Sequence, residues 1–262
     1  MQTILITGAT DGLGRELALR SGTSGARVLI HGRDEGRAER VRADIVAAGG
    51  PKPEILLADL ADLREVDELA ASISGELDVI VNNAGIGAGR PGTTREVSAD
   101  GIELRFAVNY LAGYHLTRRL LPQLAPAGRV VNVASAGQQR IDFGDPMMER
   151  GWDGFAAYQR SKLAQIMFTI DLAAERPGLT VNSLHPATFM DTTMVNESGV
   201  GPISTVAEGA DATIRLITAP HLPTGRYYNG LREARAHEQA YEADARARLR
   251  ELSDALVRNA IG

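Results

Sequence analysis

The sequence predicts an α/β protein built on one doubly wound, seven-stranded parallel sheet with helices on both faces. Short runs rich in β-branched residues alternate with longer amphipathic stretches, a pattern that requires crossover connections between parallel strands. Several short runs, such as Val79–Val81, are apolar at successive positions, as expected of strands that helices cover on both faces. Glycine, at 28 of 262 residues, exceeds its usual share of about 7% and predicts close backbone approach within the fold.

The expected strands are the short β-rich runs, and the expected helices fill the gaps between them. In chain order the strands are Thr3–Thr7, Arg27–His31, Glu54–Leu57, Asp78–Asn82, Arg129–Ala134, Thr180–His185 and Arg226–Tyr228. The helices are Gly12–Ser21, Asp34–Ala48, Arg64–Ser74, an amphipathic pair within Ser98–Leu124, Phe155–Ala174, Val206–Ile217 and a charged helix from about Ala234 to Arg258. Because no repeat and no Pro-, Gly- or Ser-rich linker divides the chain, residues 1–262 are predicted to form a single domain.

The composition excludes several classes of function. The chain has no cysteine, which excludes disulfides, thiolate metal sites and cysteine nucleophiles, and no metal site is expected. A net charge of −5 argues against non-specific binding to nucleic acid. No apolar run approaches the roughly 18 residues of a membrane span, and the apolar Ile4–Ile6 follows Met1 with no basic segment or cleavage site. We therefore expect a cytoplasmic enzyme of small molecules, whose redox chemistry would need a bound cofactor.

A glycine-rich turn joins the first strand to the first helix, with the spacing Gly-x-x-x-Gly-x-Gly. Glycine permits a tight turn and close approach, and the helix N-terminus offers unpaired N–H groups and a positive dipole end to a dinucleotide pyrophosphate. Ordinary turn chemistry is the alternative explanation. The candidate cofactor-binding residues of the turn are Gly8, Thr10, Asp11, Gly12, Leu13 and Gly14.

The end of the second strand predicts which cofactor binds. An acidic side chain there would accept a hydrogen bond from a ribose hydroxyl and would repel a 2′-phosphate. The strand ends instead in His31, Gly32 and Arg33, and the planar guanidinium of Arg33 suits phosphate. We therefore expect NADP(H) rather than NAD(H). The alternative for Arg33 is a salt bridge at the helix start with Asp34 or Glu35.

Tyr158 and Lys162 are four residues apart on a predicted helix, so their side chains share a face. A nearby cation shifts the pKa of such a group by about 1 to 3 units, which helps to make a tyrosine a usable proton donor and acceptor. Ser135 ends the apolar strand Val130–Ala134 at the edge where a substrate carbonyl could be polarised. Asn109 lies in an apolar helical stretch, where asparagine is intrinsically poor. Each of the four residues also has a purely structural explanation when taken singly.

Together Asn109, Ser135, Tyr158 and Lys162 match, in chain order, the tetrad of the short-chain dehydrogenase/reductase family, which the glycine-rich turn also resembles in its spacing. The resemblance covers essentially the whole chain and implies a Rossmann fold. It implies that Tyr158 donates a proton to the carbonyl oxygen and that Ser135 steadies this oxygen. Lys162 is implied to hold the nicotinamide ribose and to lower the tyrosine pKa, and Asn109 to position a water that links Lys162 to solvent.

The same resemblance assigns cofactor contacts after the third and fourth strands. Asp59 is implied to accept from the adenine amino group, with Leu60 alongside. The turn that contains Asn83, Ala84 and Gly85 is implied to support the sheet and the adenosine ribose, with Asn83 on the ribose side. Ordinary turn chemistry is the alternative, but both turns fall at the carboxyl ends of strands, where open α/β sheets bind ligands.

After the sixth strand the chain departs from the Pro-Gly pattern of the family. Pro186 and Thr188 are the expected cofactor contacts, but Ala187 replaces the usual glycine. This replacement leaves open whether Thr188 or Thr192 reaches the nicotinamide. His185 is interpreted as structural, because the tetrad already supplies a proton donor.

Two long segments interrupt the alternation of strands and helices. The first, between Ser135 and Tyr158, is about a dozen residues longer than in many family members and is similar to that of the retinol dehydrogenase and protochlorophyllide reductase-like subgroup. Its large apolar side chains predict either a pocket for a bulky hydrophobic carbonyl compound or a cover for the core. These side chains are Phe143, Met147, Met148 and Trp152. The second segment, residues 190–205, is predicted to be a mobile lid over the substrate.

These observations predict an NADP(H)-dependent carbonyl reductase or alcohol dehydrogenase that acts on a small, hydrophobic substrate. The alternatives are a non-catalytic NADP(H)-sensing regulator on the same fold and a nucleotide-sugar epimerase or dehydratase. A regulator would usually lack the Tyr or Lys, and an epimerase would usually carry Gly-x-x-Gly-x-x-Gly and a larger substrate region; the sequence has neither mark. The apolar stretches Phe106–Leu121 and Leu163–Leu172 predict a homodimer or homotetramer, because such helices pair across a twofold axis in similar proteins.

Overall fold

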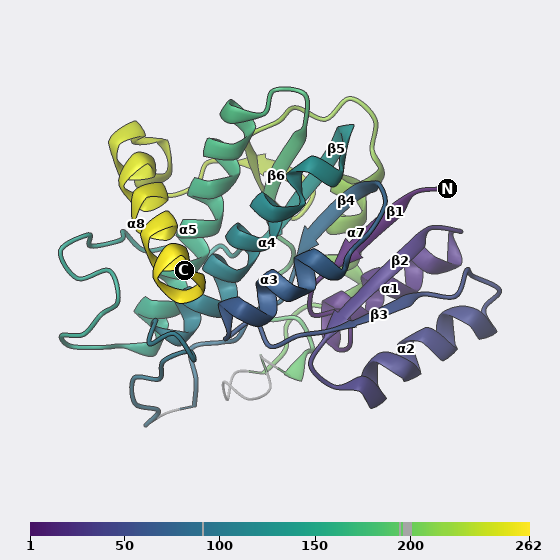
Figure 1. Ribbon diagram of the computed structural model, residues 1–262, viewed down its shortest axis with the longest axis horizontal. Helices are drawn as coiled ribbons and strands as arrows, with labels where there is room; N and C mark the ends of the chain where they lie inside the picture. Colours follow the sequence, from purple (N-terminus) through teal and green to yellow (C-terminus); the bar gives the residue numbers. More distant parts are fainter. Residues whose placement is uncertain (91, 194, 196–200) are drawn as a thin grey trace.

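The computed structural model describes residues 1–90, 92–193, 195 and 201–262. At its centre is one sheet with the strand order β3-β2-β1-β4-β5-β6-β7-β8 (Figure 1). The first seven strands in the chain are parallel, as predicted, and the eighth pairs antiparallel with β7 at the edge. The order reverses between β1 and β4, so the carboxyl ends of these strands form the crevice in which open α/β sheets bind ligands.

The predicted strands are all present, with small differences in their ends. They are β1 (Thr3–Ile6), β2 (Arg27–Gly32), β3 (Glu54–Leu57), β4 (Leu77–Asn82), β5 (Leu124–Val133), β6 (Thr180–His185) and β7 (Arg226–Asn229), followed by the unpredicted β8 (Arg232–Ala234). The α-helices are α1 (Gly12–Thr23), α2 (Glu35–Ala47), α3 (Leu63–Ser72), α4 (Ala112–Leu120), α5 (Gly154–Glu175), α7 (Val206–Thr218) and α8 (Ala243–Ile261). A π-helix, η1 (Phe106–Leu111), leads into α4, and the described residues also form the 3₁₀-helices η2 (Leu121–Gln123) and η3 (Glu238–Tyr241).

Successive residues of the central strands serve two separate cores. Leu5 and Ile80 pack on the side of α3, α4, α5 and α8. Ile4, Ile6 and Val79 pack on the opposite side, with α1, α2 and α7. Because each strand is covered on both faces, its residues are apolar at successive positions, which is the pattern that predicted the double winding.

The last helix begins later than predicted. The sequence suggested a helix from about Ala234, but Arg232–Ala234 forms β8 and α8 starts at Ala243. The intervening chain is held by the buried Gln239, whose side chain accepts from the Ile141 N–H at 2.7 Å and donates to the Ile141 carbonyl at 3.0 Å. These contacts to a residue far away in the chain fix a 3₁₀-turn where helical propensity alone would continue the helix.

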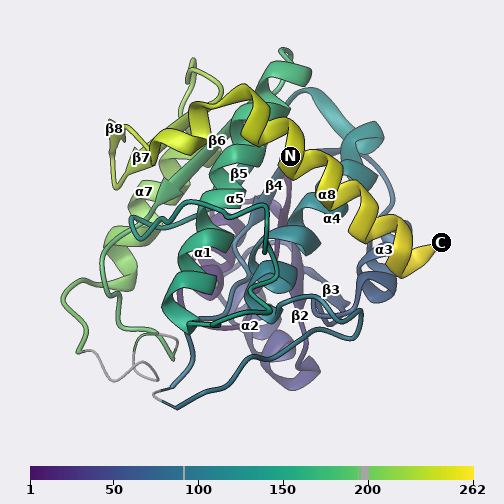
Figure 2. The ribbon, with the colours of Figure 1, turned by 90° about the vertical axis from the view of Figure 1, so that its left-hand side faces the viewer.

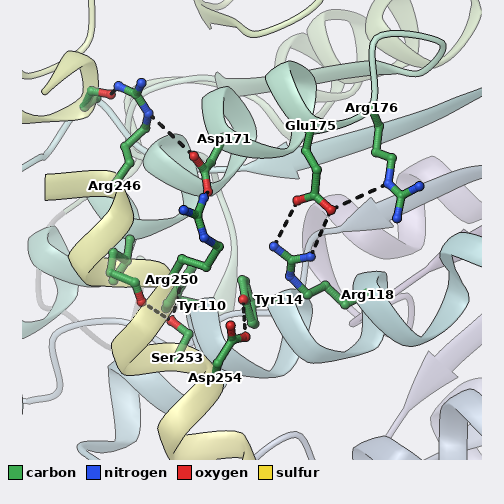
Figure 3. A network of polar contacts seen from close by, with 12 residues as sticks. Tyr110, Tyr114, Arg118, Asp171, Glu175, Arg176, Arg246, Arg250, Ser253 and Asp254 are labelled. Carbon is green, nitrogen blue, oxygen red and sulfur yellow. Dashed lines mark hydrogen bonds and ion pairs between the residues drawn. The ribbon is translucent and has the colours of Figure 1, made fainter. Parts of the chain in front are cut away.

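Helix α8 lies across α3, α4 and α5 (Figure 2). The Tyr110 and Ser253 hydroxyls share a hydrogen bond of 2.8 Å, and the Tyr114 hydroxyl donates to Asp254 at 2.6 Å (Figure 3). Beside them, Arg250 of α8 pairs with Asp171 of α5 at 2.5 Å. The apolar stretches that predicted an oligomer are therefore buried within this chain, by the sheet and by α8, and need no second copy to cover them. The oligomeric state itself stays a prediction.

Candidate active site

The glycine-rich turn connects β1 to α1 at the carboxyl edge of the sheet. Gly8 has a φ of +64°, and a Cβ at this position would lie 2.9 Å from Ala84 Cα. A Cβ on Gly14 would overlap the carbonyl oxygen of Gly8. Only glycine therefore allows the turn to pack between the strand and the helix. Asp11 caps α1 and accepts from the Gly12 N–H at 2.8 Å.

The turn after β4 clamps the glycine-rich turn. Asn83 Nδ2 donates to the carbonyl oxygens of Thr7 at 2.9 Å and Gly8 at 3.2 Å. The Thr7 hydroxyl oxygen accepts from the N–H groups of Asn83 and Ala84, both at 3.0 Å. His31 Nδ1 accepts from the Gly8 N–H at 3.2 Å, and burial lowers the pKa of His31 to about 4, which keeps this ring neutral. Thr7 and His31 thus support the site, although the sequence analysis did not select them.

The basic and acidic residues predicted to meet the adenosine end face each other. Arg33 lies 3.5 Å from Asp59 and pairs with neither Asp34 nor Glu35 in the described structure, which argues against the helix-start alternative. Asp34 instead caps α2 by accepting from the Arg37 N–H at 2.8 Å. The Arg37 guanidinium reaches to 3.7 Å from Asp11 of the glycine-rich turn. Arg37 was missed, although its place in the first turn of a predicted helix after β2 pointed toward this edge.

Four further predicted cofactor residues are placed as follows. Thr10 lies over Gly32 at the end of β2, with its methyl carbon 2.5 Å from where a Cβ on that glycine would be. Leu13 is buried in the core on the α1 side of the sheet, and Leu60 is buried in the core on the α3 side. A Cβ on Gly85 would lie 3.2 Å from Asn109 Oδ1, so this position is adjacent to the tetrad.

Tyr158, Ser135 and Lys162 come together where β5 ends and α5 begins. Burial raises the pKa of Tyr158, and the nearby Ser135 side chain offsets part of the rise. The Lys162 ammonium lies 5.7 Å from the centroid of the Tyr158 ring. It donates to the Val133 carbonyl at 2.8 Å and to Gln165 Oε1 at 3.0 Å, and its burial lowers the pKa to about 7. The resemblance implied a lowered pKa for Tyr158, whereas in the structure the pKa of Tyr158 is raised, because burial outweighs the effect of its polar neighbour.

Asn109 occupies the π-helix η1 rather than a regular α-helix. Its Nδ2 donates to the Ile86 carbonyl at 3.1 Å and to Ser161 Oγ at 3.0 Å, and its Oδ1 accepts from the Ile86 N–H at 2.7 Å. Ser161 in turn donates to the Tyr158 carbonyl at 2.6 Å. Asn109 therefore ties the turn after β4 to the helix that carries Tyr158, and π-helical turns of this kind recur at functional sites.

The chain after β6 follows the carboxyl edge of the sheet back to the glycine-rich turn. Pro186 is buried, and His185 Nε2 lies 3.0 Å from the Thr188 hydroxyl. Thr192 packs its methyl group against Gly12, and the Thr193 hydroxyl donates to Asp11 at 2.7 Å. The left-handed residue of this turn is Phe189, with a φ of +45°, which explains how Ala187 can replace glycine.

The predicted lid, residues 190–205, is described only in part. Residues 194 and 196–200, which include Gly199, lie outside the described residues. Within the described part, Met190 and Ser204 form a β-bridge, and the Asp191 N–H donates to the Ser204 carbonyl at 3.2 Å. The lid function stays a prediction.

The long segment before α5 packs mainly on the protein itself. Met148 is only 5% exposed, and Phe143 and Met147 pack against the core on the α8 side. The Trp152 indole N–H donates to Glu103 at 3.2 Å. The Arg105 guanidinium lies over the same indole, with its central carbon 5.1 Å from the centroid of the Trp152 ring. The structure favours the second of the two sequence interpretations, in which these side chains cover the core.

Comparison with known proteins agrees with this geometry. The family model for short chain dehydrogenases matches residues 2–201. A protein of Streptomyces sp. (strain C5), provisionally named daunorubicin C-13 ketoreductase, is 35% identical over 98% of this chain and 92% of its own length. Retinol dehydrogenase 14 of Mus musculus is 34% identical over 98% of this chain and 86% of its own.

A solved structure extends the comparison to the fold. A short-chain dehydrogenase from Shigella flexneri 2a strain 301, complexed with NADP, matches 88% of this chain and 97% of its own with a TM-score of 0.69 and 26% identity. The glycine-rich turn, the neighbouring side chains of Ser135 and Tyr158, and Lys162 beside Tyr158 occur here on that same fold. The chain therefore belongs to the short-chain dehydrogenase/reductase family of oxidoreductases, in its retinol dehydrogenase-like subgroup.

Proposed function

We propose that this oxidoreductase is an NADP(H)-dependent carbonyl reductase or alcohol dehydrogenase that acts on a small, hydrophobic substrate. One observation carries the proposal. Ser135, Tyr158 and Lys162 lie together at the carboxyl edge of the sheet, the same edge that carries the glycine-rich turn. The nicotinamide, when bound, supplies the chemistry that no side chain of this chain has, namely hydride transfer to or from the substrate carbon.

The residues present fit a dinucleotide. The glycines let the turn pack closely against Ala84 and the start of α1, which places the N-terminus of α1 at this edge of the sheet, and a helix N-terminus suits a pyrophosphate. Arg33 and Arg37 approach this edge from the end of β2 and the start of α2, each beside a carboxylate. A 2′-phosphate with up to two negative charges would compete with Asp59 and Asp11 for these guanidiniums. This arrangement supports NADP(H), and the solved relative above carries NADP.

The proton chemistry follows from the tetrad. Because its pKa is raised, Tyr158 is a neutral phenol at physiological pH, the form that donates a proton to a carbonyl oxygen. Ser135, whose side chain lies near Tyr158, is positioned to share the same oxygen. After donation, the phenolate needs a cation nearby, and Lys162 is the cation within reach in the described structure. Asn109 and Ser161 hold the start of α5, so that Tyr158 is fixed relative to the sheet.

The nature of the substrate rests on the relatives and on the surface near the site. The relatives named above act, by their names, on retinol and on a daunorubicin ketone. Exposed apolar side chains close to the site in sequence, Phe155 and Phe189, are 61% and 43% exposed. Both observations support a lipophilic ketone, aldehyde or alcohol.

Other expectations about the protein stay proposals. We propose that it acts on small molecules without nucleic acid, that residues 190–205 close over the substrate, and that it forms a homo-oligomer. In the described part of the chain, no helix is long and apolar enough to cross a bilayer. A cytoplasmic location is proposed from the absence of cysteine.

A spectrophotometric screen tests the proposal. Purified protein is incubated with lipophilic ketones, aldehydes, quinones and steroids, and oxidation of NADPH and of NADH is followed by absorbance. We expect turnover of at least one lipophilic carbonyl compound, faster with NADPH, and none with Tyr158→Phe. Tight NADPH binding without turnover of any compound would contradict the enzyme proposal and favour the sensing regulator.

A further inference from the structure

His185 is a buried polar residue that the proposed proton chemistry does not use. It ends β6 with 8% of its surface exposed, and its carbonyl oxygen accepts from the Gly230 N–H at 2.8 Å. Burial lowers the pKa of His185, and the charge of Lys162 lowers it further. The imidazole is therefore neutral at physiological pH and carries one N–H and one lone pair. A hydroxyl group complements either ring nitrogen, because it can both donate and accept.

That hydroxyl belongs to Thr188, three residues further along. Its Oγ1 lies 3.0 Å from His185 Nε2, and its carbonyl oxygen accepts from the Ser204 hydroxyl at 2.6 Å. Thr188 is thus held through its side chain and its backbone, although it lies at the surface. A polar group fixed before a ligand arrives need not be ordered on binding, which favours affinity.

The position of Thr192 separates the two threonines that the sequence left as candidates. Thr192 packs against Gly12, at the end of the site where the pyrophosphate is expected, and its hydroxyl donates to the Met190 carbonyl at 3.4 Å. His185, by contrast, directly follows Leu184, which pairs with Val133 and accepts from the Ala134 N–H at 2.8 Å, so it lies beside the end of β5 that carries Ser135, where the nicotinamide is expected. Thr188 therefore lies at the end of the site where the carboxamide is expected, and Thr192 does not.

We infer that His185 is a positioning residue, which holds the Thr188 hydroxyl ready to hydrogen-bond the nicotinamide carboxamide. The inference rests on the proposed function, because it requires that NADP(H) binds along this edge. His185 would touch neither the cofactor nor the substrate; it acts through Thr188. Its effect should therefore be confined to ligands that contain the nicotinamide half.

Calorimetric titration with two ligands tests the role of His185 by binding alone, so no substrate is needed. NADPH contains the nicotinamide, whereas adenosine 2′,5′-bisphosphate contains only the end that Arg33 and the glycine-rich turn are proposed to bind. His185→Ala and Thr188→Val should each raise the Kd of NADPH by about 3- to 10-fold, the range for one neutral hydrogen bond. The double variant should lose no more than the larger single loss, because both changes remove one contact. The Kd of the bisphosphate should stay within about 2-fold of the wild-type value.

Two matched variants separate positioning from damage to the fold. Ser183→Ala, on the same strand, removes a buried hydroxyl for which the described residues offer no partner, and it should leave both dissociation constants unchanged. His185→Gln places an amide near the former Nε2 and should recover most of the NADPH affinity. Equal weakening of both ligands by His185→Ala, or unchanged NADPH binding, would overturn the inference alone. A wild-type protein that binds neither ligand would instead overturn the proposed function, and the inference with it.

Discussion

The Lys162 ammonium lies 5.7 Å from the centroid of the Tyr158 ring and donates to the Val133 carbonyl oxygen at 2.8 Å. Two neutral oxygens, those of Val133 and Gln165, are the acceptors that the described structure gives this ammonium. These two hydrogen bonds do not offset the hydration that the charged ammonium loses on burial, so the pKa of Lys162 falls to about 7. Near pH 7 the lysine is therefore divided between its charged and neutral forms.

The lowered pKa of Lys162 predicts that the stability of the protein depends on pH. Between about pH 7 and its unperturbed pKa near 10.4, Lys162 is neutral in the folded state and charged in the unfolded state. The unfolded state then binds more protons, so the free energy of unfolding rises with pH, by up to about 1.4 kcal/mol per pH unit. Below pH 7 Lys162 is charged in both the folded and the unfolded state, so it adds no further pH dependence. The folded state then carries the full free-energy cost of burying the charged ammonium. Urea denaturation of the wild type and of Lys162→Met, at pH 6 to 9, isolates the effect as the difference between them. A difference that does not change with pH would contradict the assignment.

Tyr158→Phe should abolish most of the turnover and little of the cofactor binding. The change removes the hydroxyl that donates the proton, and general acid–base assistance is worth about 10²- to 10⁴-fold in rate. The ring still fills its place, and the glycine-rich turn and Arg33 do not touch it. Once a substrate is found, kcat and the NADPH dissociation constant of this variant should be measured together. Turnover close to the wild-type value would disprove the role of Tyr158.

Arg33→Ala should discriminate between the two nicotinamide cofactors. A charged hydrogen bond to phosphate is worth about 1.5 to 3 kcal/mol, so NADPH affinity should fall by about 10-fold or more while NADH affinity stays nearly constant. Arg37→Ala is the companion variant, because Arg37 approaches the same edge from α2 and lies beside Asp11. Titrations of both cofactors with both variants give the answer. If Arg33→Ala weakens NADPH and NADH equally, Arg33 does not recognise the phosphate.

Tyr110→Phe should loosen the contact between α8 and the rest of the fold. Tyr110 is fully buried apart from 2% of its surface, and its hydroxyl shares a hydrogen bond of 2.8 Å with Ser253. The variant should lose about 1 kcal/mol of unfolding free energy, because Ser253 keeps its bond to the Leu249 carbonyl at 2.7 Å. Urea denaturation measures the loss. Ser253→Ala and the double variant complete a cycle, and strictly additive losses would show that the two hydroxyls do not interact.

Local patterns were sufficient to predict most of the fold, whereas the members of the tetrad were named by their resemblance to the family. The first strand, its glycine-rich turn and α1 follow from residues next to each other in the chain. The pairing of Tyr158 with Lys162 on one helical face follows from their spacing, and Ser135 follows from the end of an apolar strand. The structure places these residues together because the carboxyl ends of parallel strands meet at one edge.

The remaining features depend on contacts between distant segments. Strand β8 is three residues of mixed polarity, and only its pairing with β7 makes it a strand. Whether Phe143 and Trp152 face a substrate or the core depends on where α8 and Glu103 lie, which no local period reveals. The meeting of Arg37 with Asp11 depends in the same way on how α2 packs beside the glycine-rich turn.

The closure of α4 and α5 by α8 also bears on how the chain folds during its synthesis. Tyr110 and its partner Ser253 are 143 residues apart in the sequence. At typical translation rates of about 5 to 20 residues per second, the second partner is made roughly 7 to 30 seconds after the first. For most of that time the apolar face of α4 lacks the helix that covers it, and so does the face of α5 once Glu175 has been made. A nascent chain of this protein is therefore a candidate client for chaperones that shield apolar surface, until α8 has left the ribosome and docked.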